Sequence, residues 1–367
     1  MCEGDAEFHG SLRCGRLNGE NGRIEVLGDL TCETEVDVEK SSELRVAGSL
    51  EARSVEVDSR LSVGKSAKAE EFDVGGMLEI GGSVTARTVD VGGAFRVQGS
   101  AEVEDVDVGG AVAVEGQVKI ATLDVGGSAR VGGGEISKQV DVGGSFVSAG
   151  PLKFGDIDVG GTVTLDRGGE GGGIEVGGRF ESRGNLSFET IDVGGTVEIT
   201  GNGEGEAVDV GGSLEVSGDL TLKRDLEIGG KARVGGSLRL QSLEVGGVVE
   251  AGLIEARDKV EVGGRLTTAK GTKAGTIELG SRSEARGVLV GTRVRIRDKA
   301  RVEDVYADVA TLEEGVRAGN LYIRAARIES GCRITGEVLY LETIEADPDA
   351  EFSQPPVKTA ELPRPPI

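Results

Sequence analysis

The feature that most constrains this chain is the phrase Asp-Val-Gly-Gly, which returns at a fixed interval. Valine or an equivalent apolar residue stands at 57, 74, 91, 108, 125, 142, 159, 176, 193 and 210, and then, after one step of 18, at 228, 245, 262 and 279. All other steps are 17 residues. A period kept this long is typical of a solenoid, in which each repeat packs only on its neighbours.

Each repeat predicts three short strands. In Asp90–Val106 the apolar residues alternate with polar ones in three groups, separated by Gly92-Gly93, Gln98-Gly99-Ser100 and Glu104-Asp105. Alternation indicates strands, and glycine supplies the backbone angles that tight corners require. The fold class is therefore all-β, a single-stranded triangular parallel β-helix. About 20 coils stacked about 4.8 Å apart would make a rod of about 95 Å.

The repeat also sets the domain boundaries. Residues 1–344 are predicted to form the solenoid, with the most regular repeats in 57–294. Residues 345–367 hold six of the seven prolines, which cannot continue a ladder, so we expect a disordered tail there.

Composition excludes several functions. A net charge of −23 argues against nucleic acid as a partner, because binding phosphates requires Lys and Arg. No apolar run is long enough for a membrane span, and "MCEGDAEFHG" lacks the features of a secretory signal. His9 is the single histidine, and no hydrolase, metalloprotease or P-loop motif is present. We expect a cytoplasmic protein that is not an enzyme and needs no cofactor.

The cysteines leave two interpretations open. Cys14 and Cys32 fall on the same inward position as Ala52 and Ala69 in the following coils. They are either small buried apolar residues or a disulfide between stacked strands. Cys332 also falls on an inward position.

From position 73 to position 278 an acidic residue precedes the apolar residue of each repeat and is predicted to face outward, which makes a ladder of like charges. Its role could be solvation and repulsion of neighbouring sheets, recruitment of a basic partner, or cation binding. The metal candidates within it are Asp73, Asp90, Asp107, Asp124, Asp141, Asp158, Asp192 and Asp209.

Residues 282–301 form a basic patch in an otherwise acidic chain. They are either a solvated face or a docking surface for the acidic ladder of a neighbouring copy. The patch consists of Arg282, Arg286, Arg293, Arg295, Arg297, Lys299 and Arg301. Tyr306, Tyr322 and Tyr340 lie near the same end, and the sequence does not decide whether they face inward or outward.

The two ends of the solenoid are candidate assembly faces. An uncovered coil presents unpaired backbone groups and an apolar cross-section, which is a template for another copy. The first coil begins near residue 6, which leaves no room for a cap. The candidate residues are Phe8, Leu12 and Leu17 at the N-terminal face, and Tyr322, Tyr340, Leu341, Ile344 and Phe352 at the C-terminal end.

With its 17-residue coils, few aromatics and Pro-rich tail, the chain resembles the bactofilins, a family of polymer-forming cytoskeletal proteins. The resemblance covers residues 6–344 and implies a right-handed β-helix that assembles end to end into filaments without a nucleotide. The family's N-terminal membrane-targeting segment has no counterpart in "MCEGDAEFHG", so membrane attachment is not implied. We therefore expect a self-assembling structural scaffold. The alternative is an acidic binding scaffold that recruits basic partners or cations along its ladder.

Overall fold

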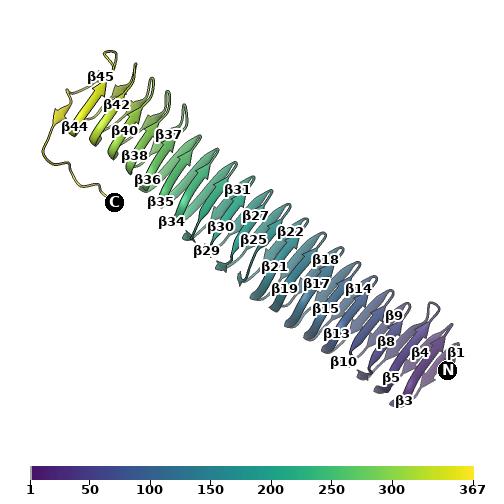
Figure 1. The fold of residues 1–367 in the computed structure, drawn as a ribbon. Helices are drawn as coiled ribbons and strands as arrows, with labels where there is room; N and C mark the ends of the chain where they lie inside the picture. Colours follow the sequence, from purple (N-terminus) through teal and green to yellow (C-terminus); the bar gives the residue numbers. More distant parts are fainter. Residues whose placement is uncertain (1) are drawn as a thin grey trace. The chain divides into compact units, whose positions relative to one another are not determined.

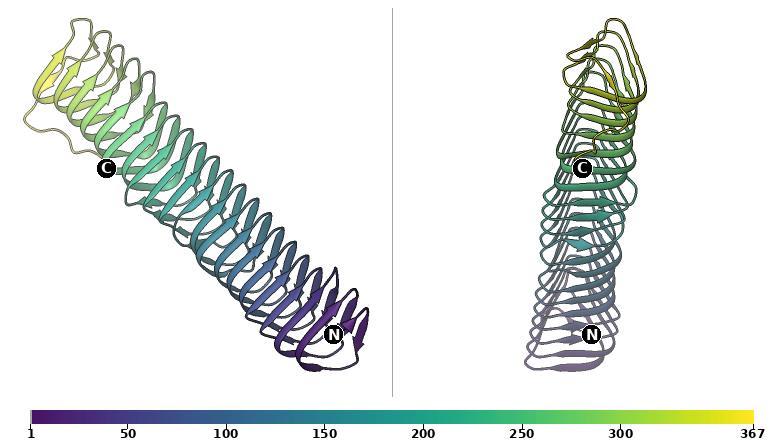
Figure 2. Two further views of the ribbon diagram at one scale, coloured as in Figure 1. Left: turned by 45° about the vertical axis from the view of Figure 1, so that its right-hand side comes forward. Right: turned by 90° about the vertical axis from the view of Figure 1, so that its left-hand side faces the viewer.

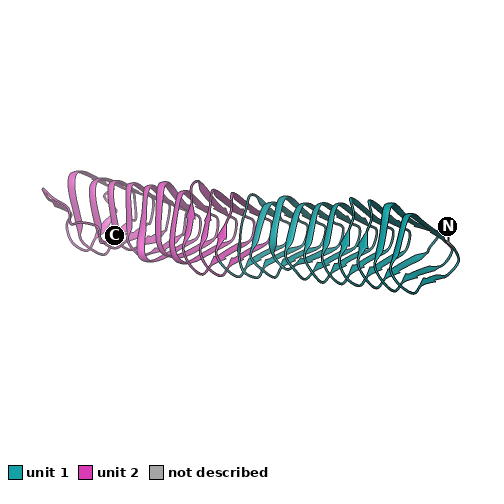
Figure 3. Ribbon diagram, turned by 90° about the horizontal axis from the view of Figure 1, so that it is seen from below, with its two compact units in different colours: residues 1–184 teal, residues 185–367 magenta. Residues whose placement is uncertain are grey.

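The computed structural model describes residues 2–367, and these residues contain strands and no helix. They divide into two compact units, residues 1–184 and 185–367, coloured separately in Figure 3. Within each unit all strand pairs with a recorded register are parallel, as in β13–β15 (Val84–Val91 with Ala101–Val108). The predicted all-β parallel solenoid is confirmed.

Each coil has three sides, which we number in chain order (Figure 1). β14 (Ala94–Val97) is a first side, and β15 (Ala101–Val108) bends through a second side and a third side. Val91 pairs with Val108 in the next coil, so the 17-residue period of the sequence is the register of the sheet.

In unit 1 the first sides are β2 (Ala6–Phe8), β4 (Arg23–Val26), β6 (Glu43–Val46), β9 (Arg60–Val63), β12 (Met77–Ile80), β14, β16 (Ala111–Val114), β18 (Ser128–Val131), β20 (Ser145–Ser148), β22 (Thr162–Leu165) and β25 (Arg179–Ser182). The second and third sides are β1 (Cys2–Glu3), β3 (Leu12–Glu20), β5 (Leu30–Glu39), β7 (Leu50–Glu51), β8 (Ser54–Val57), β10 (Ala67–Lys68), β11 (Glu71–Val74), β13, β15, β17 (Val118–Val125), β19 (Gly134–Val142), β21 (Leu152–Val159), β23 (Gly169–Glu170) and β24 (Ile174–Val176).

In unit 2, β34 (Lys231–Val245), β35 (Val248–Val262) and β36 (Arg265–Leu279) each run through all three sides. The other first sides are β28 (Thr196–Ile199), β31 (Ser213–Val216), β37 (Glu284–Arg286), β39 (Arg301–Val302), β41 (Arg317–Ala318), β43 (Arg333–Ile334) and β45 (Glu351–Phe352). The remaining second and third sides are β26 (Leu186–Ser187), β27 (Thr190–Val193), β29 (Gly203–Gly205), β30 (Ala207–Val210), β32 (Leu220–Leu222), β33 (Asp225–Ile228), β38 (Leu289–Ile296), β40 (Val305–Leu312), β42 (Leu321–Ile328), β44 (Val338–Ala346) and β46 (Val357–Lys358).

The core of each unit is a stack of inward side chains whose volumes compensate one another. Phe188 in unit 2 fills the space that Gly205 leaves in the next coil, where an added Cβ would lie 2.2 Å from the Phe188 ring. In unit 1 the same relation holds between Phe154 and Gly171. A large residue is therefore accommodated by a glycine one coil later, as close packing of interiors requires.

The Gly-Gly corners have a different cause from the one expected. Gly92 and Gly93 do not have positive φ, so these bends do not need the left-handed region. A Cβ on Gly92 would instead lie 2.2 Å from the carbonyl oxygen of Gly75 in the preceding coil. The corners stack so closely that no side chain fits between them, and this close approach is what selects glycine.

Beyond Leu279 the coil changes. Tyr306 pairs with Tyr322 at a spacing of 16 residues, and the corners before the first sides β37, β39, β41 and β43 each carry a left-handed residue. These residues are Arg282 (φ 60°), Lys299 (φ 59°), Gly315 (φ 69°) and Gly331 (φ 67°). The solenoid continues there with different turn chemistry, which explains why the Gly-Gly phrase disappears.

The segment 345–367, expected to be a disordered tail, contains strand structure. β45 pairs with β43, and β46 pairs with β44, so the ladder extends past residue 344. The chain then turns back along unit 2, as both views of Figure 2 show. Its last residue, Ile367, lies against Gly271, at a point where glycine leaves room for the Ile367 side chain.

Candidate functional site

The acidic ladder exists and runs along the third sides of unit 1. Asp73 pairs with Asp90, and the register continues through Asp107, Asp124, Asp141 and Asp158 to Glu175. Two acids that the sequence analysis missed, Asp37 and Glu56, extend it toward the N-terminus. All members from Glu56 to Glu175 are exposed, as predicted.

No basic group lies within 4.0 Å of the ladder carboxylates from Glu56 to Glu175, counting the described residues. Partial burial, followed by repulsion from Asp107 and Asp73, raises the pKa of Asp90. Partial burial, followed by Asp107 and Asp141, raises the pKa of Asp124. From Glu56 to Glu175 the ladder of unit 1 is therefore a line of uncompensated negative charge, whereas Asp37 is paired with Arg16 at 3.0 Å.

The ladder of unit 2 is different because it acquires cations. It runs from Asp192 and Asp209 through Glu227, Glu244 and Glu261 to Glu278. Lys259 lies 2.6 Å from Glu261 and 3.4 Å from Glu278. The next coil places Arg295 in the same column, which ends the run of acids.

The aspartates considered as metal candidates follow one another one per coil within each unit, six in unit 1 and two in unit 2. Among residues 2–367 no three His, Cys, Asp or Glu side chains gather in a way that could hold a metal ion. In-line carboxylates present their charges in succession, whereas a metal ion needs several ligands that converge on one point.

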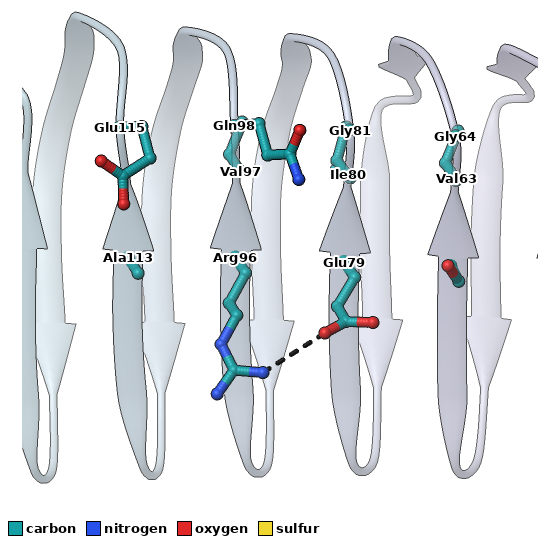
Figure 4. A pocket seen from close by; sticks show the side chains of 11 residues that line it. Val63, Gly64, Glu79, Ile80, Gly81, Arg96, Val97, Gln98, Ala113 and Glu115 are labelled. Carbon is teal, nitrogen blue, oxygen red and sulfur yellow. Dashed lines mark hydrogen bonds and ion pairs between the residues drawn. The ribbon is translucent and has the colours of Figure 1, made fainter.

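A surface groove on unit 1 lies across the first sides β9, β12, β14 and β16 (Figure 4). Its volume is about 730 Å³, and it is open to solvent. Glu79 and Arg96 form an ion pair of 3.3 Å across it, and most of the remaining lining is aliphatic side chain and backbone. Glu115 also lines the groove and has no cation within 4.0 Å among the described residues, so the groove carries one ion pair and one further acid.

The basic patch does not form one face. Arg286 and Arg301 lie on first sides, Arg293 and Arg295 on a third side, and the others at the corner between those sides. Arg286, Arg295 and Arg297 are paired with Glu284 (3.0 Å), Glu313 (2.6 Å) and Glu278 (3.7 Å). Arg282, Arg293, Lys299 and Arg301 have no carboxylate within 4.0 Å in the described part of the chain.

The N-terminal edge of unit 1 presents Phe8 and Leu12. β2 is hydrogen-bonded only to β4, and Leu12 of β3 pairs with Leu30 of the next coil. Among residues 2–367, the opposite edge of β2, and of β3 at Leu12, has no partner strand. Both side chains are half-buried. Leu17 does not belong to this face: it is only 5 % exposed, because β1 runs beside the end of that third side.

The C-terminal edge of unit 2 is formed by two of the five expected residues. Ile344 ends the third-side column after Ala326, and Phe352 ends the first-side column after Ile334. Both are half-buried, and within the described residues no strand follows either of them. Tyr340 is covered by Lys358 of β46, and the half-buried Leu341 belongs to the corner of that coil.

Tyr322 lies one coil below that edge and faces outward. Val290, Tyr306, Tyr322 and Leu339 pair in succession and form an outward apolar stripe. The rings of Tyr306 and Tyr322 are 4.6 Å apart, and the Tyr322 hydroxyl donates to Glu337 at 2.7 Å. Burial, followed by this hydrogen bond, raises the pKa of Tyr322. Tyr340 is offset by one residue, so it faces the opposite way.

Residues 359–367, which we call the strap, turn back past the coils that carry the apolar stripe. Thr359 donates its N–H to the Tyr340 carbonyl. Ile367 reaches Gly271, which directly precedes the second side of the coil four coils before that of Tyr340. Leu362 and Ile367 are half-buried, whereas Pro363, Arg364, Pro365 and Pro366 are exposed. Tyr322 is only 8 % exposed despite its outward direction, which agrees with cover from the strap.

Hydrogen-bond ladders at the corners after some of the first sides were not predicted. In unit 2 the N–H of Asp219 donates to the Asn202 side chain, and the N–H of Ser237 donates to Asp219. In unit 1 Ser83 and Ser100 repeat this contact. The signal was present as Ser, Asp or Asn at recurring corner positions, which are side chains that bond local backbone groups.

The described residues therefore define a parallel β-solenoid protein with a charged ladder and two apolar edges. No helix among them is long and apolar enough to cross a membrane. No protein-family model matches the sequence, and no curated protein or solved structure was found to match it.

Proposed function

We propose that this chain is a self-assembling structural protein of the bactofilin type, in which copies stack through the edges of their terminal coils. The observation that carries the proposal is the pair of open edges. β2 in unit 1 and β45 in unit 2 each have one strand neighbour, and the inward side chains Phe8 and Phe352 are half-buried there. An unpaired parallel edge with an apolar cross-section favours addition of another coil.

Stacking by this route needs no nucleotide. Each added copy would satisfy backbone N–H and C=O groups and bury apolar side chains, and both are favourable without a chemical step. The exposed acids along the third side would at the same time oppose sheet-to-sheet contact between copies, because like charges repel. This combination favours growth at the ends over growth at the sides.

The test is the assembly state of purified protein by analytical ultracentrifugation and electron microscopy. Phe8→Asp places a charge at the N-terminal edge and is expected to give monomers. Val309→Asp is the matched control, because Val309 is an apolar residue that is 40 % exposed and lies between two paired coils. A wild-type protein that is monomeric at every concentration, or a Phe8→Asp variant that polymerises normally, refutes the proposal.

A second candidate function is recruitment of a basic partner along the ladder of unit 1. It is favoured by the absence of any cation near the described carboxylates from Glu56 to Glu175. Replacing Asp90, Asp107 and Asp124 with Asn should abolish binding of a lysine-rich peptide and leave end-to-end assembly intact. Peptide binding that survives these changes excludes the ladder as the recruiting surface.

A further inference from the structure

Two thiols meet in adjacent coils at the N-terminal edge of unit 1. Cys14 of β3 and Cys32 of β5 are paired in register, and both point inward from the second side. Their Sγ atoms are 2.9 Å apart, and both cysteines are free thiols. Adjacent strands lie about 4.8 Å apart, within the range of Cα separations that a disulfide spans.

Accessibility distinguishes the two cysteines. Cys32 is only 4 % exposed, whereas Cys14 is half-buried because its coil forms the open edge. Burial, followed by the hydrogen bond with Cys14, raises the pKa of Cys32 to about 12. Cys14 is therefore the thiol that a reagent reaches first, whereas Cys32 is the protonated, less accessible thiol of the pair.

The third described cysteine provides an internal contrast. Cys332 is fully buried in unit 2, and its Sγ lies 3.0 Å from the Glu313 carbonyl oxygen. The residues after Cys32 in its own column, Ala52 and Ala69, show that this inward position needs only a small apolar side chain. Packing alone therefore does not require sulfur at two successive coils.

We propose that Cys14 and Cys32 form a thiol–disulfide site that reacts with low-molecular-weight disulfides such as oxidised glutathione. The Cys14 thiolate attacks one sulfur of the reagent, and the first small thiol leaves. Cys32 then loses its proton to solvent and attacks Cys14 Sγ, and the second small thiol leaves. The protein gives up two electrons and two protons, and the reagent takes them up as two thiols.

The bond ties the terminal coil to the coil after it. An edge coil packs on one neighbour only and opens more readily than the interior. Linking Cys14 to Cys32 is expected to slow amide exchange in β2 and the first half of β3. If the proposed end-to-end stacking holds, the same bond keeps the N-terminal face ordered for the next copy.

The experiment uses the full chain with Cys2→Ser, which leaves three thiols. After equilibration with oxidised glutathione, free thiols are counted and disulfides are mapped by mass spectrometry. The expected result is one remaining thiol, at Cys332, and an intramolecular Cys14–Cys32 link that dithiothreitol removes. The added change Cys332→Ser should leave the link intact, and Cys14→Ser should abolish it.

Three results would each overturn the inference: both thiols remain reduced, mixed disulfides accumulate without closing, or the link joins two different chains. Amide exchange of residues 6–20, compared between the oxidised and reduced protein, provides a second readout. Equal exchange in the two forms excludes the stabilising role. Because stacking would cover the N-terminal edge, the same measurements are repeated with Phe8→Asp, in which that edge stays open, so that a failure of this site is distinguishable from a failure of the proposed function.

Discussion

The ladder of unit 1 predicts that removing one charge stabilises the solenoid. Asp107 pairs with Asp90 on one side and Asp124 on the other, and no cation lies near it in the described structure. Unit charges about 4.8 Å apart repel by about 0.9 kcal/mol in water. Asp107→Asn keeps the shape of the side chain and removes two such repulsions. The upper limit of the resulting stabilisation is therefore about 1.7 kcal/mol at low salt.

Amide exchange in β15 measures this effect locally, which is preferable because long repeat arrays need not unfold in one step. A gain of about 1.7 kcal/mol slows exchange by about fifteenfold, since about 1.4 kcal/mol corresponds to a factor of ten. At about 1 M salt the screening length is about 3 Å and most of the gain should vanish.

The matched control is Asp105→Asn, on the same strand. Asp105 pairs with Thr88 and Thr122, so it has no acidic neighbour in register. It should change exchange little at either salt concentration. The claim that repulsion between ladder carboxylates destabilises the solenoid is refuted if the two changes slow exchange equally. It is also refuted if the stabilisation by Asp107→Asn persists in high salt.

The ladder also predicts the direction in which stability changes with pH. The native pKa values of Asp90 and Asp124 are raised above the ordinary carboxyl value, so the native state binds protons more tightly than the unfolded chain. Their ionisation costs stability, and that cost disappears as the pH falls through the raised values toward the ordinary carboxyl pKa of about 4. Asp107→Asn should flatten this trend, because Asp107 contributes to both shifts.

Three further predictions concern packing. Gly92→Ala should destabilise its corner by about 1–3 kcal/mol, measured by local amide exchange, because the new Cβ would lie 2.2 Å from a carbonyl oxygen. The control Gly15→Ala should be nearly neutral, because nothing lies within 4 Å of its Cβ position. Equal effects of the two changes would contradict the stacking explanation. Gly205→Ala should lower the thermal midpoint, and adding Phe188→Leu should recover part of the loss by removing the ring 2.2 Å away; a purely additive double variant would contradict the paired-volume account. Ile367→Asp should release the strap and change the tyrosine fluorescence, which is readable because the chain has no Trp; an unchanged spectrum would show that the strap does not cover the stripe.

Much of the architecture follows from the sequence because the period and the register are the same quantity. Once Val91 and Val108 are one coil apart, the inward columns and the outward acids are fixed by alternation. The reason for glycine at the corners was not accessible, because it depends on how close the stacked carbonyls lie.

The C-terminal part resisted prediction for a related reason. Spacings of 16, 17 and 18 residues succeed one another there, and a shift of one residue reverses the direction of every side chain. This is why Tyr306 and Tyr322 share an outward column while Tyr340 does not. The strap was also missed, because its anchor is the absence of a side chain at Gly271 rather than a motif.

The most direct test of the central claim is cryo-electron microscopy of the purified full chain, imaged without nucleotide over a range of concentrations. The account predicts filaments in which the strand spacing of about 4.8 Å continues through each junction between copies. The coil containing Phe8 or the coil containing Phe352 should lie at every junction. Particles that remain single at all concentrations, or filaments whose copies meet through the third-side acids instead of the terminal coils, would contradict it.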